Sequence, residues 1–308
     1  MSGSTDRPLR AGVIGLGAMG LPMASNLARG GVATFGCDTH PAARERAAKT
    51  AGLTLIETPA AMAKQCDVVF TCLPSLAAVR AVYEGDDGLF AAAHAGLITA
   101  ECSTIDSDMA RTIAASMTAR GAAHIETLLL GRPEDSAAAQ LYFVVSGDRA
   151  VAEQVAPLLK HMGRGWRHVG GNGSANTIKI LQNGLGYVYA VATAEALALA
   201  RARGVDVEAF IEVVKEGRGI GASRYFELYA AGVAAARDDG WGRLYIAAKD
   251  TDALTRETTA AGLDLPFFAA TDAEYHKAVE AGLADAEFTA VSRMLEARNG
   301  KRLFGPPD

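Results

Sequence analysis

Several features that mark other classes of protein are scarce in this chain of 308 residues. Lys and Arg number 30 against 35 Asp and Glu, a formal net charge of −5, so no basic surplus is available to neutralise a nucleic-acid backbone. No uncharged apolar stretch approaches the roughly 18 residues that a membrane span requires, and residues 1–10 are polar and charged, unlike a secretory signal. We therefore expect no nucleic-acid partner, no membrane span and a cytoplasmic location.

Cysteine and paired histidine are also sparse. Only four cysteines are present, and no two of them are spaced as C-x-x-C. Cys37, Cys72 and Cys102 lie in or beside apolar strand-like runs, which predicts small buried side chains in a reducing compartment, without disulfides. No two of the six histidines are three to five residues apart, so the sequence shows no helical or finger-type ligand pair. We expect no metal site.

What the chain does contain is the composition of a folded, two-domain protein. Half of the residues are hydrophobic, 21% are charged and the mean hydropathy is +0.12, which excludes a disordered chain. At about 150 residues per domain, the length predicts two domains, each large enough for its own core.

The first half of the chain alternates short apolar runs with alanine-rich stretches of helical period. This order predicts a mostly parallel sheet with helices on both faces, a doubly wound α/β domain of the Rossmann type over residues 1–172. The predicted strands are 11–14, 33–37, 67–72, 97–100, 122–125 and 141–145. The predicted helices are 18–29, 41–50, 75–83, 106–120 and 148–161.

After the glycine-rich turn at 170–173 the strand-like runs disappear. Residues 174–203 contain no proline and repeat apolar side chains at three- and four-residue steps, which predicts one helix of about 45 Å. This helix is expected to join the first domain to an all-α C-terminal domain, residues 173–308. Further helices are predicted over 206–215, 225–236, 243–260, 267–281 and 286–298.

A G-x-G-x-x-G motif lies directly between the first predicted strand and the first predicted helix. Its residues are Gly15, Leu16, Gly17, Ala18, Met19 and Gly20. In this motif the first glycine turns the chain, the second admits a pyrophosphate close to the backbone, and the third lets helix and strand pack closely. A turn without a ligand is the alternative for such a motif found alone.

Asp38 supplies the context that favours a dinucleotide. It ends the next predicted strand, near the roughly 20-residue offset of the acid that bonds the adenosine ribose. Its alternative role is a helix cap before Pro41. Because a carboxylate repels a 2′-phosphate, NAD is favoured over NADP as the cofactor.

Lys179 and Asn183 are four residues apart near the start of the long predicted helix, so both project from one face. The flanking Ile178 and Ile180 indicate partial burial, which lowers an amine's pKa from about 10.4 toward the working pH. Such a lysine exchanges a proton with a hydroxyl or carbonyl oxygen. A solvated helix lysine is the alternative.

These features together resemble the β-hydroxyacid dehydrogenase family, which includes 3-hydroxyisobutyrate dehydrogenase, tartronate semialdehyde reductase and threonate dehydrogenase. The most specific match is the extended glycine signature, residues 15–27. A second is the register G-x-x-G-x-x-x-x-x-K-x-x-x-N, met by Gly170, Gly173, Lys179 and Asn183. Shorter matches are Leu73-Pro74-Ser75, Ser103-Thr104-Ile105-Asp106 and Lys249-Asp250.

The resemblance implies hydride transfer between NAD and a 3-hydroxy acid or its semialdehyde. Lys179 would be the catalytic acid/base and Asn183 an amide that positions the substrate. The resemblance further implies a homodimer or homotetramer.

The resemblance also implies further contacts to the cofactor. Leu73, Pro74 and Thr104 would line the nicotinamide side, and Lys249 would close over cofactor or substrate. A strand-end capping hydroxyl is the alternative for Thr104, and a surface lysine paired with Asp250 is the alternative for Lys249.

The predicted substrate-binding segment departs from the family. Relatives carry D-A-P-V-S-G-G where this chain has residues 126–132, E-T-L-L-L-G-R. Leu130 stands where the family's serine would bond a substrate carboxylate, Gly131 is kept, and Arg132 follows. Arg132 offers a bidentate grip on a carboxylate, sulfonate or phosphate, or is a loop arginine paired with the acidic residues that follow it.

Two rival functions remain open at this point. An imine reductase shares the overall plan, but those relatives usually carry an aspartate or tyrosine where this chain has Lys179. A catalytically inactive nucleotide-binding regulatory or scaffold protein is consistent with the altered substrate segment. A methyltransferase is disfavoured because its glycine loop is not expected with this lysine helix, and 6-phosphogluconate dehydrogenase has a much larger helical domain.

Overall fold

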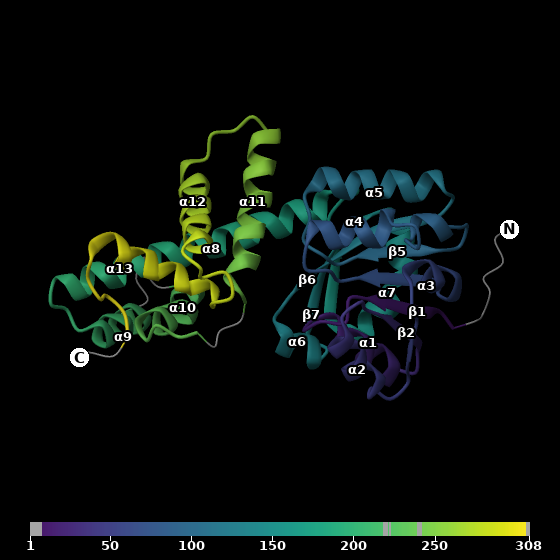
Figure 1. Cartoon of the computed structure of the whole chain (residues 1–308), viewed down its shortest axis with the longest axis horizontal. Helices are drawn as coiled ribbons and strands as arrows, with labels where there is room; N and C mark the ends of the chain where they lie inside the picture. Colours follow the sequence, from purple (N-terminus) through teal and green to yellow (C-terminus); the bar gives the residue numbers. More distant parts are fainter. Residues whose placement is uncertain (1–7, 218–220, 222, 239–241, 306–308) are drawn as a thin grey trace. The chain divides into compact units, whose positions relative to one another are not determined.

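The computed structural model describes residues 8–217, 221, 223–238 and 242–305. The chain forms two compact units, one up to Lys179 and one from Ile180 onward. The first unit is a sheet with helices on both faces, and the second is built of helices (Figure 1). The predicted fold class, a doubly wound α/β domain followed by an all-α domain with a long helix between them, is thereby confirmed. The two units divide within that helix, after the boundary predicted at residue 173.

The sheet has eight strands in the order β3-β2-β1-β4-β5-β6-β7-β8, and all neighbours are parallel except β6 and β7. The strands are β1 (Arg10–Ile14), β2 (Ala33–Cys37), β3 (Leu53–Leu55), β4 (Val68–Thr71), β5 (Ile98–Glu101), β6 (Ala123–Leu130), β7 (Leu141–Gly147) and β8 (Gly163–His168). The two edge strands, β3 and β8, were not predicted from the sequence. An edge strand contacts one neighbour only, and these two lack the long apolar runs of the central strands.

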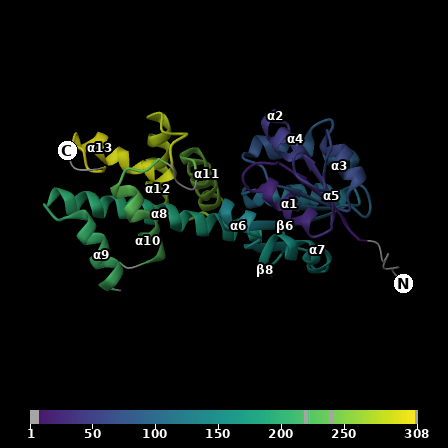
Figure 2. The same cartoon turned by 90° about the horizontal axis from the view of Figure 1, so that it is seen from below.

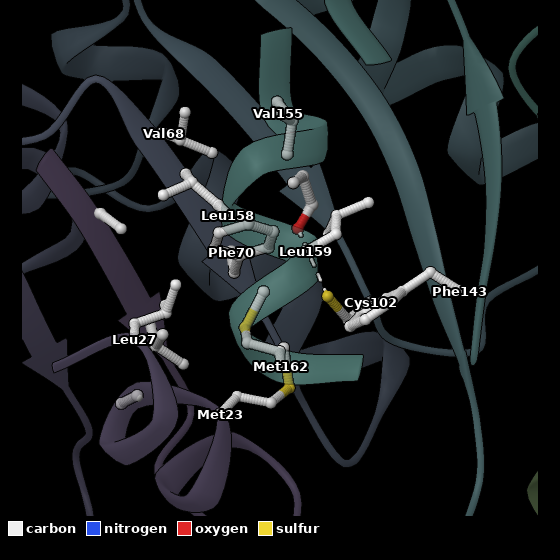
Figure 3. Packing of buried hydrophobic residues seen from close by; sticks show 14 of the residues in the cluster. Met23, Leu27, Val68, Phe70, Cys102, Phe143, Val155, Leu158, Leu159 and Met162 are labelled. Atoms are coloured by element: carbon white, nitrogen blue, oxygen red, sulfur yellow. Dashed lines mark hydrogen bonds between the residues drawn. The ribbon is translucent and has the colours of Figure 1, made fainter. Parts of the chain in front are cut away.

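Each face of the sheet carries its own core because side chains alternate along a strand. Val68 and Phe70 of β4 point into one core, and Val69 points into the other. Figure 3 shows Phe70 surrounded by side chains of two helices that lie far apart in the sequence, among them Leu27 and Leu158. Burying one such side chain stabilises the fold by about 1.5–3 kcal/mol.

The helices of the first unit divide between the two faces. On the face of Val68 and Phe70 lie α1 (Gly20–Arg29), α2 (Pro41–Ala48) and α7 (Arg149–Met162). On the other face lie α3 (Pro59–Gln65), α4 (Leu76–Glu84) and α5 (Ser107–Ala119). Two further short helices are η1 (Phe90–Ala92) and α6 (Pro133–Ala137). The helices α3 and α6 were not predicted from the sequence, because seven and five residues are too few to show a helical period.

The four cysteines are free thiols in this sheet domain, as predicted. Cys37, Cys66 and Cys102 are buried, and Cys72 is partly buried. Burial raises the pKa of the Cys37 thiol to about 11 and that of Cys66 to about 12. Both therefore stay protonated at neutral pH and act as small apolar side chains.

The second unit holds most of the long helix α8 (Ser174–Ala202), which begins in the first unit, and the helices that follow it (Figure 2). These are α9 (Val207–Gly217), α10 (Arg224–Ala234), α11 (Leu244–Ala260), α12 (Pro266–Glu280), η2 (Phe288–Ser292) and α13 (Arg293–Asn299). The fully buried Tyr275 of α12 lies in its core. Across the described ranges, no helix combines the length and the apolar character that crossing a membrane demands.

One predicted helix of this unit is corrected by the structure. Residues 286–298 do not form one helix but a 3₁₀ turn, η2, followed by α13. Glu287 is the N-cap of this turn, and its Oε2 accepts from the Thr289 amide at 2.8 Å and also from the Thr289 hydroxyl. A side chain that bonds the backbone two residues on favours a turn over a regular helix.

Candidate active site

The glycine loop at the end of β1 has two positions that only glycine can occupy and a third where a side chain would fit. Gly15 has φ +93°, and a Cβ there would clash with the Cys72 carbonyl. A Cβ on Gly20 would clash with the Gly15 carbonyl. A Cβ on Gly17 would meet nothing within 4 Å. The loop therefore leaves free space where the motif predicts that a pyrophosphate approaches the backbone.

The helix that follows suits an anion. No acidic residue lies in the first turn of α1, and Met19 at its N-cap makes no side-chain capping bond. The helix dipole and the first-turn amides thus present positive charge at this end. A groove of about 510 Å³ runs along α1, and Gly17, Ala18 and Arg29 are among its lining residues. These residues fit the phosphates of a dinucleotide.

Asp38 joins the glycine loop to the end of β2. Its Oδ2 accepts from the Leu16 amide at 2.7 Å, and its Oδ1 accepts from the His40 amide at 2.7 Å. The N-cap of α2 is His40, so Asp38 is not the cap of that helix. The carboxylate is thus held beside the glycine loop by two amide bonds, and its role as a ribose ligand stays a prediction.

The ends of β4 and β5 are tied together by Ser103. Its Oγ accepts from the Leu73 amide at 2.8 Å, and its own amide donates to Glu101 Oε1 at 2.7 Å. Leu73 and Thr104 are partly buried and Pro74 is exposed. These three predicted cofactor contacts thus lie on two loops that the structure brings together, and the hydroxyl that bridges the strand ends belongs to Ser103.

Glu101 is a fully buried carboxyl beneath this junction, and burial raises its pKa to about 7. In an unfolded chain a glutamate has a pKa of about 4.3. Between about pH 4.3 and pH 7, the Glu101 carboxyl is protonated in the folded protein but ionised in the unfolded chain. Stability therefore falls as the pH rises through this range and levels off above pH 7.

We therefore predict that Glu101→Gln removes this pH dependence. At pH 8 the variant should be more stable than the parent by about 2 kcal/mol, and at pH 5 the two should agree, because the amide oxygen still accepts from Ser103. Urea unfolding at both pH values measures the effect. An equal difference at both pH values would show that Glu101 is not the titrating group.

A second buried carboxyl, Glu126 of β6, anchors the start of α8. Its Oε2 accepts from the Ser146 hydroxyl at 2.5 Å and from the Gly173 amide, and its Oε1 accepts from the Asn176 side chain at 2.6 Å and the Asn176 amide at 3.1 Å. Asn176 Oδ1 in turn accepts from the Ile105 amide at 2.9 Å. One carboxylate therefore accepts from a first-turn amide of α8 and from the amide just before the helix, and Asn176 links the helix to the Thr104 loop.

Lys179 lies one turn into α8, and its Nζ donates to the Leu129 carbonyl at 2.8 Å. Lys179 as a residue is partly buried. The predicted acid/base and the predicted substrate segment, Leu130, Gly131 and Arg132, are therefore brought together within the first unit. Leu130 is partly buried and Gly131 is exposed.

Arg132 makes contacts with the acidic residues that follow it. Its amide donates to Asp135 Oδ2 at 2.8 Å, and its guanidinium lies 3.8 Å from Glu134 Oε2. The side chain is 45% exposed, so its ion pair with Glu134 is weak, and the guanidinium is accessible to an anionic ligand. The sequence allowed two roles for Arg132, a grip on an anionic substrate group or a pairing with the acidic residues that follow it. This geometry agrees with both.

In the second unit, Asn183 belongs to a network around Asp250 that the sequence did not predict. Asp250 is buried, and its Oδ2 accepts from Asn183 Nδ2 at 2.7 Å and from the Tyr187 hydroxyl at 2.9 Å. Lys249 Nζ lies 3.2 Å from Asp250 Oδ1, and the Lys249 side chain is only 21% exposed. The sequence left open that Lys249 is a surface lysine paired with Asp250. The pairing is observed, but the side chain is too little exposed to be a surface lysine.

Asp252 of α11 lies close to Asp272 and His276 of α12, and all three carry atoms of the kind that bind metal ions. His276 Nε2 lies 3.1 Å from Asp252 Oδ1, and its Nδ1 lies 3.2 Å from Asp272 Oδ1. Partial burial alone would lower the pKa of His276, but the Asp272 carbonyl and the two carboxylates outweigh it and raise the pKa. The cluster links the two helices through contacts of one imidazole with two carboxylates. The spacing of histidines along the sequence could not reveal this cluster, because it consists of one histidine and two aspartates from two helices.

Comparison with known proteins identifies the fold and its relatives. The model of the NAD-binding domain of 6-phosphogluconate dehydrogenase matches residues 10–171, and that described as NAD-binding of NADP-dependent 3-hydroxyisobutyrate dehydrogenase matches residues 173–295. An NAD-dependent L-serine dehydrogenase of Pseudomonas aeruginosa is 30% identical over 94% of this chain and 98% of its own. The chain belongs to the β-hydroxyacid dehydrogenase family.

Other members of this family agree. A 3-hydroxyisobutyrate dehydrogenase of Pseudomonas aeruginosa is 34% identical over 67% of this chain and 69% of its own. A Mycobacterium tuberculosis 3-hydroxyisobutyrate dehydrogenase, solved with L-serine, superposes with a TM-score of 0.82 at 26% identity and covers 94% of this chain and 99% of its own. An imine reductase from Myxococcus stipitatus shares the fold, with a TM-score of 0.61 at 20% identity over 93% of this chain and 99% of its own. The family is one of NAD(P)-dependent hydroxyacid dehydrogenases, and the predicted family resemblance is confirmed.

Proposed function

We propose that the protein is an NAD-dependent dehydrogenase that transfers a hydride between the nicotinamide and a 3-hydroxy acid or its semialdehyde, with Lys179 as general acid/base. The observation that carries the proposal is the Lys179 amine, held 2.8 Å from the Leu129 carbonyl next to the predicted substrate segment. Asn183 follows one turn later on α8. A proton carrier and an amide thus project from one helix face.

The residues of the chain have distinct tasks in this proposal. When bound, the cofactor supplies the hydride acceptor or donor. Lys179 removes the hydroxyl proton during oxidation and returns it to the carbonyl oxygen during reduction. Asn183, which Asp250 holds at 2.7 Å, orients the substrate oxygen. Such fixed placement contributes to rate because the reacting groups no longer have to find each other.

Substrate binding is assigned to the segment around Leu130. Leu130 offers no hydroxyl to a substrate carboxylate, so this group must find another donor. Arg132 supplies it in our proposal, by a bidentate grip that exchanges its weak contact to Glu134 for a charge-assisted one. The Gly131 backbone, at φ +142°, gives the segment its turn.

An assay of NADH absorbance with a panel of 3-hydroxy acids and semialdehydes tests the function. We expect reversible NAD-dependent oxidation of at least one 3-hydroxy acid. Calorimetric binding of NAD with no turnover across the panel would contradict the proposal and favour a nucleotide-binding regulatory protein. Reduction of cyclic imines in place of carbonyls would favour the imine reductase alternative.

Asp38 carries the proposed preference for NAD. We predict that Asp38→Ser lowers the ratio of NAD to NADP affinity by at least about tenfold, since the change removes a ribose ligand and the repulsion of a 2′-phosphate. The serine also loses one of the two amide bonds that Asp38 makes. Asp148→Ser, an exposed helix-capping aspartate elsewhere in the same domain, serves as the control. A parent enzyme that binds NADP as tightly as NAD would contradict this role.

We further propose a homodimer or homotetramer. Apolar side chains on α8 support an association, since Leu181, Leu185 and Leu199 are all exposed in the single chain. Size-exclusion chromatography should give a mass of at least twice 32.0 kDa. A single peak at the monomer mass would refute it.

A further inference from the structure

The short helix α6 follows directly on the predicted substrate segment, and Arg132 is its N-cap residue. The Arg132 amide donates to Asp135 Oδ2 at 2.8 Å, and the Arg132 carbonyl accepts from the Ser136 amide at 3.0 Å. The position of the Arg132 backbone is therefore set by the position of α6. Helices shorter than about 12 residues are marginal in water by themselves. The five residues of α6 thus depend on contacts with the rest of the domain for their place.

Two hydrogen bonds join α6 to α1, the helix that begins at the glycine loop (Figure 1). The Asn26 side-chain amide donates to the Ser136 carbonyl at 2.7 Å, and the Ser136 hydroxyl donates to the Met19 carbonyl at 2.9 Å. Ser136 has no exposed surface, and Asn26 is only 4% exposed. Ser136 is thus fixed through its backbone and its side chain at once, so α6 neither turns nor slides along α1 without breaking a buried hydrogen bond.

Arg29 determines which way the Asn26 amide points. One guanidinium nitrogen, Nη2, donates to Asn26 Oδ1, and the same nitrogen donates to the Ala137 carbonyl at 3.4 Å. An asparagine amide has one acceptor end and one donor end. Because Arg29 occupies the acceptor end, the donor end faces the Ser136 carbonyl. Two side chains of α1 therefore contact successive carbonyls of α6.

The contact between α6 and α1 lies at the predicted cofactor loop. Met19, whose carbonyl accepts from Ser136, is a member of the G-x-G-x-x-G motif. Ala137 at the end of α6 lines the groove of about 510 Å³ together with Gly17 and Ala18. The helix therefore borders the glycine loop at one end and begins at Arg132 at the other.

We infer that Asn26 and Ser136 are positioning residues of the active site, which fasten α6 to α1 and thereby hold Arg132 where it binds the anionic group of the substrate. The inference rests on the proposed function, because that proposal makes Arg132 the partner of this group. The exposed Arg132 side chain loses conformational freedom when it binds an anion. If α6 were loose, its backbone would have to be ordered as well, and the affinity for the anion would fall.

The test measures how tightly 3-hydroxypropanoate binds to the protein loaded with NADH. Both compounds are then in the reduced form and no hydride is transferred, so calorimetry reports affinity alone. We expect Ser136→Ala to raise the dissociation constant of 3-hydroxypropanoate at least about fivefold. The dissociation constant of NADH should stay within about twofold, because the Met19 carbonyl still accepts from the Met23 amide at 3.3 Å.

Thr118→Ala is the matched control. The Thr118 hydroxyl also donates to a carbonyl at 2.9 Å, that of Ala114, but both residues belong to α5, on the other face of the sheet. This variant removes the same kind of hydrogen bond without releasing one element from another. It should leave both dissociation constants unchanged.

A double-mutant cycle shows whether Ser136 acts through Arg132. Arg132→Ala by itself should weaken the binding of 3-hydroxypropanoate at least about tenfold. Adding Ser136→Ala to Arg132→Ala should have no further effect, since the group that α6 positions is then absent. A separate fivefold loss in that background would overturn the inference, and so would an unchanged dissociation constant in Ser136→Ala alone.

Hydrogen exchange tests the fastening of α6 without any ligand. The Ala138 amide donates to the Glu134 carbonyl at 2.9 Å and therefore reports the opening of this helix. It should exchange at least about fivefold faster in Ser136→Ala and in Asn26→Ala than in the parent. Equal exchange rates in all three proteins would contradict the inference. Faster exchange and weaker binding, in variants of a protein that does not oxidise 3-hydroxy acids, would support the positioning role and refute the proposed hydride transfer.

Discussion

Lys179→Ala should lower turnover at least a hundredfold while NAD binds as tightly as before. Positioned acid–base catalysis contributes about 10²–10⁴ in rate, and the amine that supplies it here is placed by its bond to the Leu129 carbonyl. Apart from Lys249 on α11, the predicted cofactor contacts lie on the loops after β1, β2, β4 and β5, and removing the Lys179 side chain leaves all of them in place. Stopped-flow turnover and calorimetric titration with NAD measure the two effects separately.

Two further variants decide what the lysine does. Lys179→Arg keeps the positive charge and a donor for Leu129 but does not deprotonate in proteins, so it should be nearly as inactive as the alanine variant. Lys215→Ala, an exposed lysine on α9, is the matched control and should retain full activity. If Lys179→Arg kept turnover within tenfold of the parent, Lys179 would position the substrate without transferring a proton.

Glu126→Ala should lower the free energy of unfolding by about 3–5 kcal/mol, the largest stability effect that we expect of a single residue near the site. Its carboxylate is fully buried and accepts from three residues, Ser146, Gly173 and Asn176. Without it their buried donors lose their acceptor, and each such loss costs about 1–3 kcal/mol. Urea unfolding measures the change.

The same variant should affect catalysis through α8. The first turn of this helix is held by Glu126, and Lys179 lies one turn further on, so a displaced helix start moves the amine. We expect kcat to fall while the affinity for NAD stays unchanged. Glu153→Ala removes an exposed carboxylate on α7 and should alter neither stability nor kcat. A Glu126→Ala protein as stable as the parent would show that water or other side chains replace the carboxylate.

The sequence predicted the local features of the site because each depends on residues close together in the chain. The G-x-G-x-x-G motif followed an apolar run and preceded a helical period, and the structure places Gly15 and Gly20 where a side chain would clash. The spacing of Lys179 and Asn183 on one helix is likewise a local property. The central strands were found for the same reason, since their apolar runs face two cores.

The sequence did not reveal how acidic residues hold the site together. Glu101, Glu126 and Asp250 are each buried and bonded to residues that lie near or far along the chain; Glu126 and Asn176, for example, are separated by 50 positions. A carboxylate within an apolar run is a signal for such a role, and both Glu101 and Glu126 follow that pattern. Its partners, however, cannot be named until strands and helices are placed.

The sequence by itself determined the fold class, the glycine loop, the order of strands and helices in the core and the helix face that carries Lys179. These follow from periodicity and from steric limits on the backbone, which act over a few residues. Tertiary structure alone decided that Lys179 bonds to Leu129, that Asp250 holds Asn183, and that four aromatic residues help to line a pocket beside Asn183. Such contacts join residues distant in the chain, and their energies depend on burial, which exists only once the elements have packed.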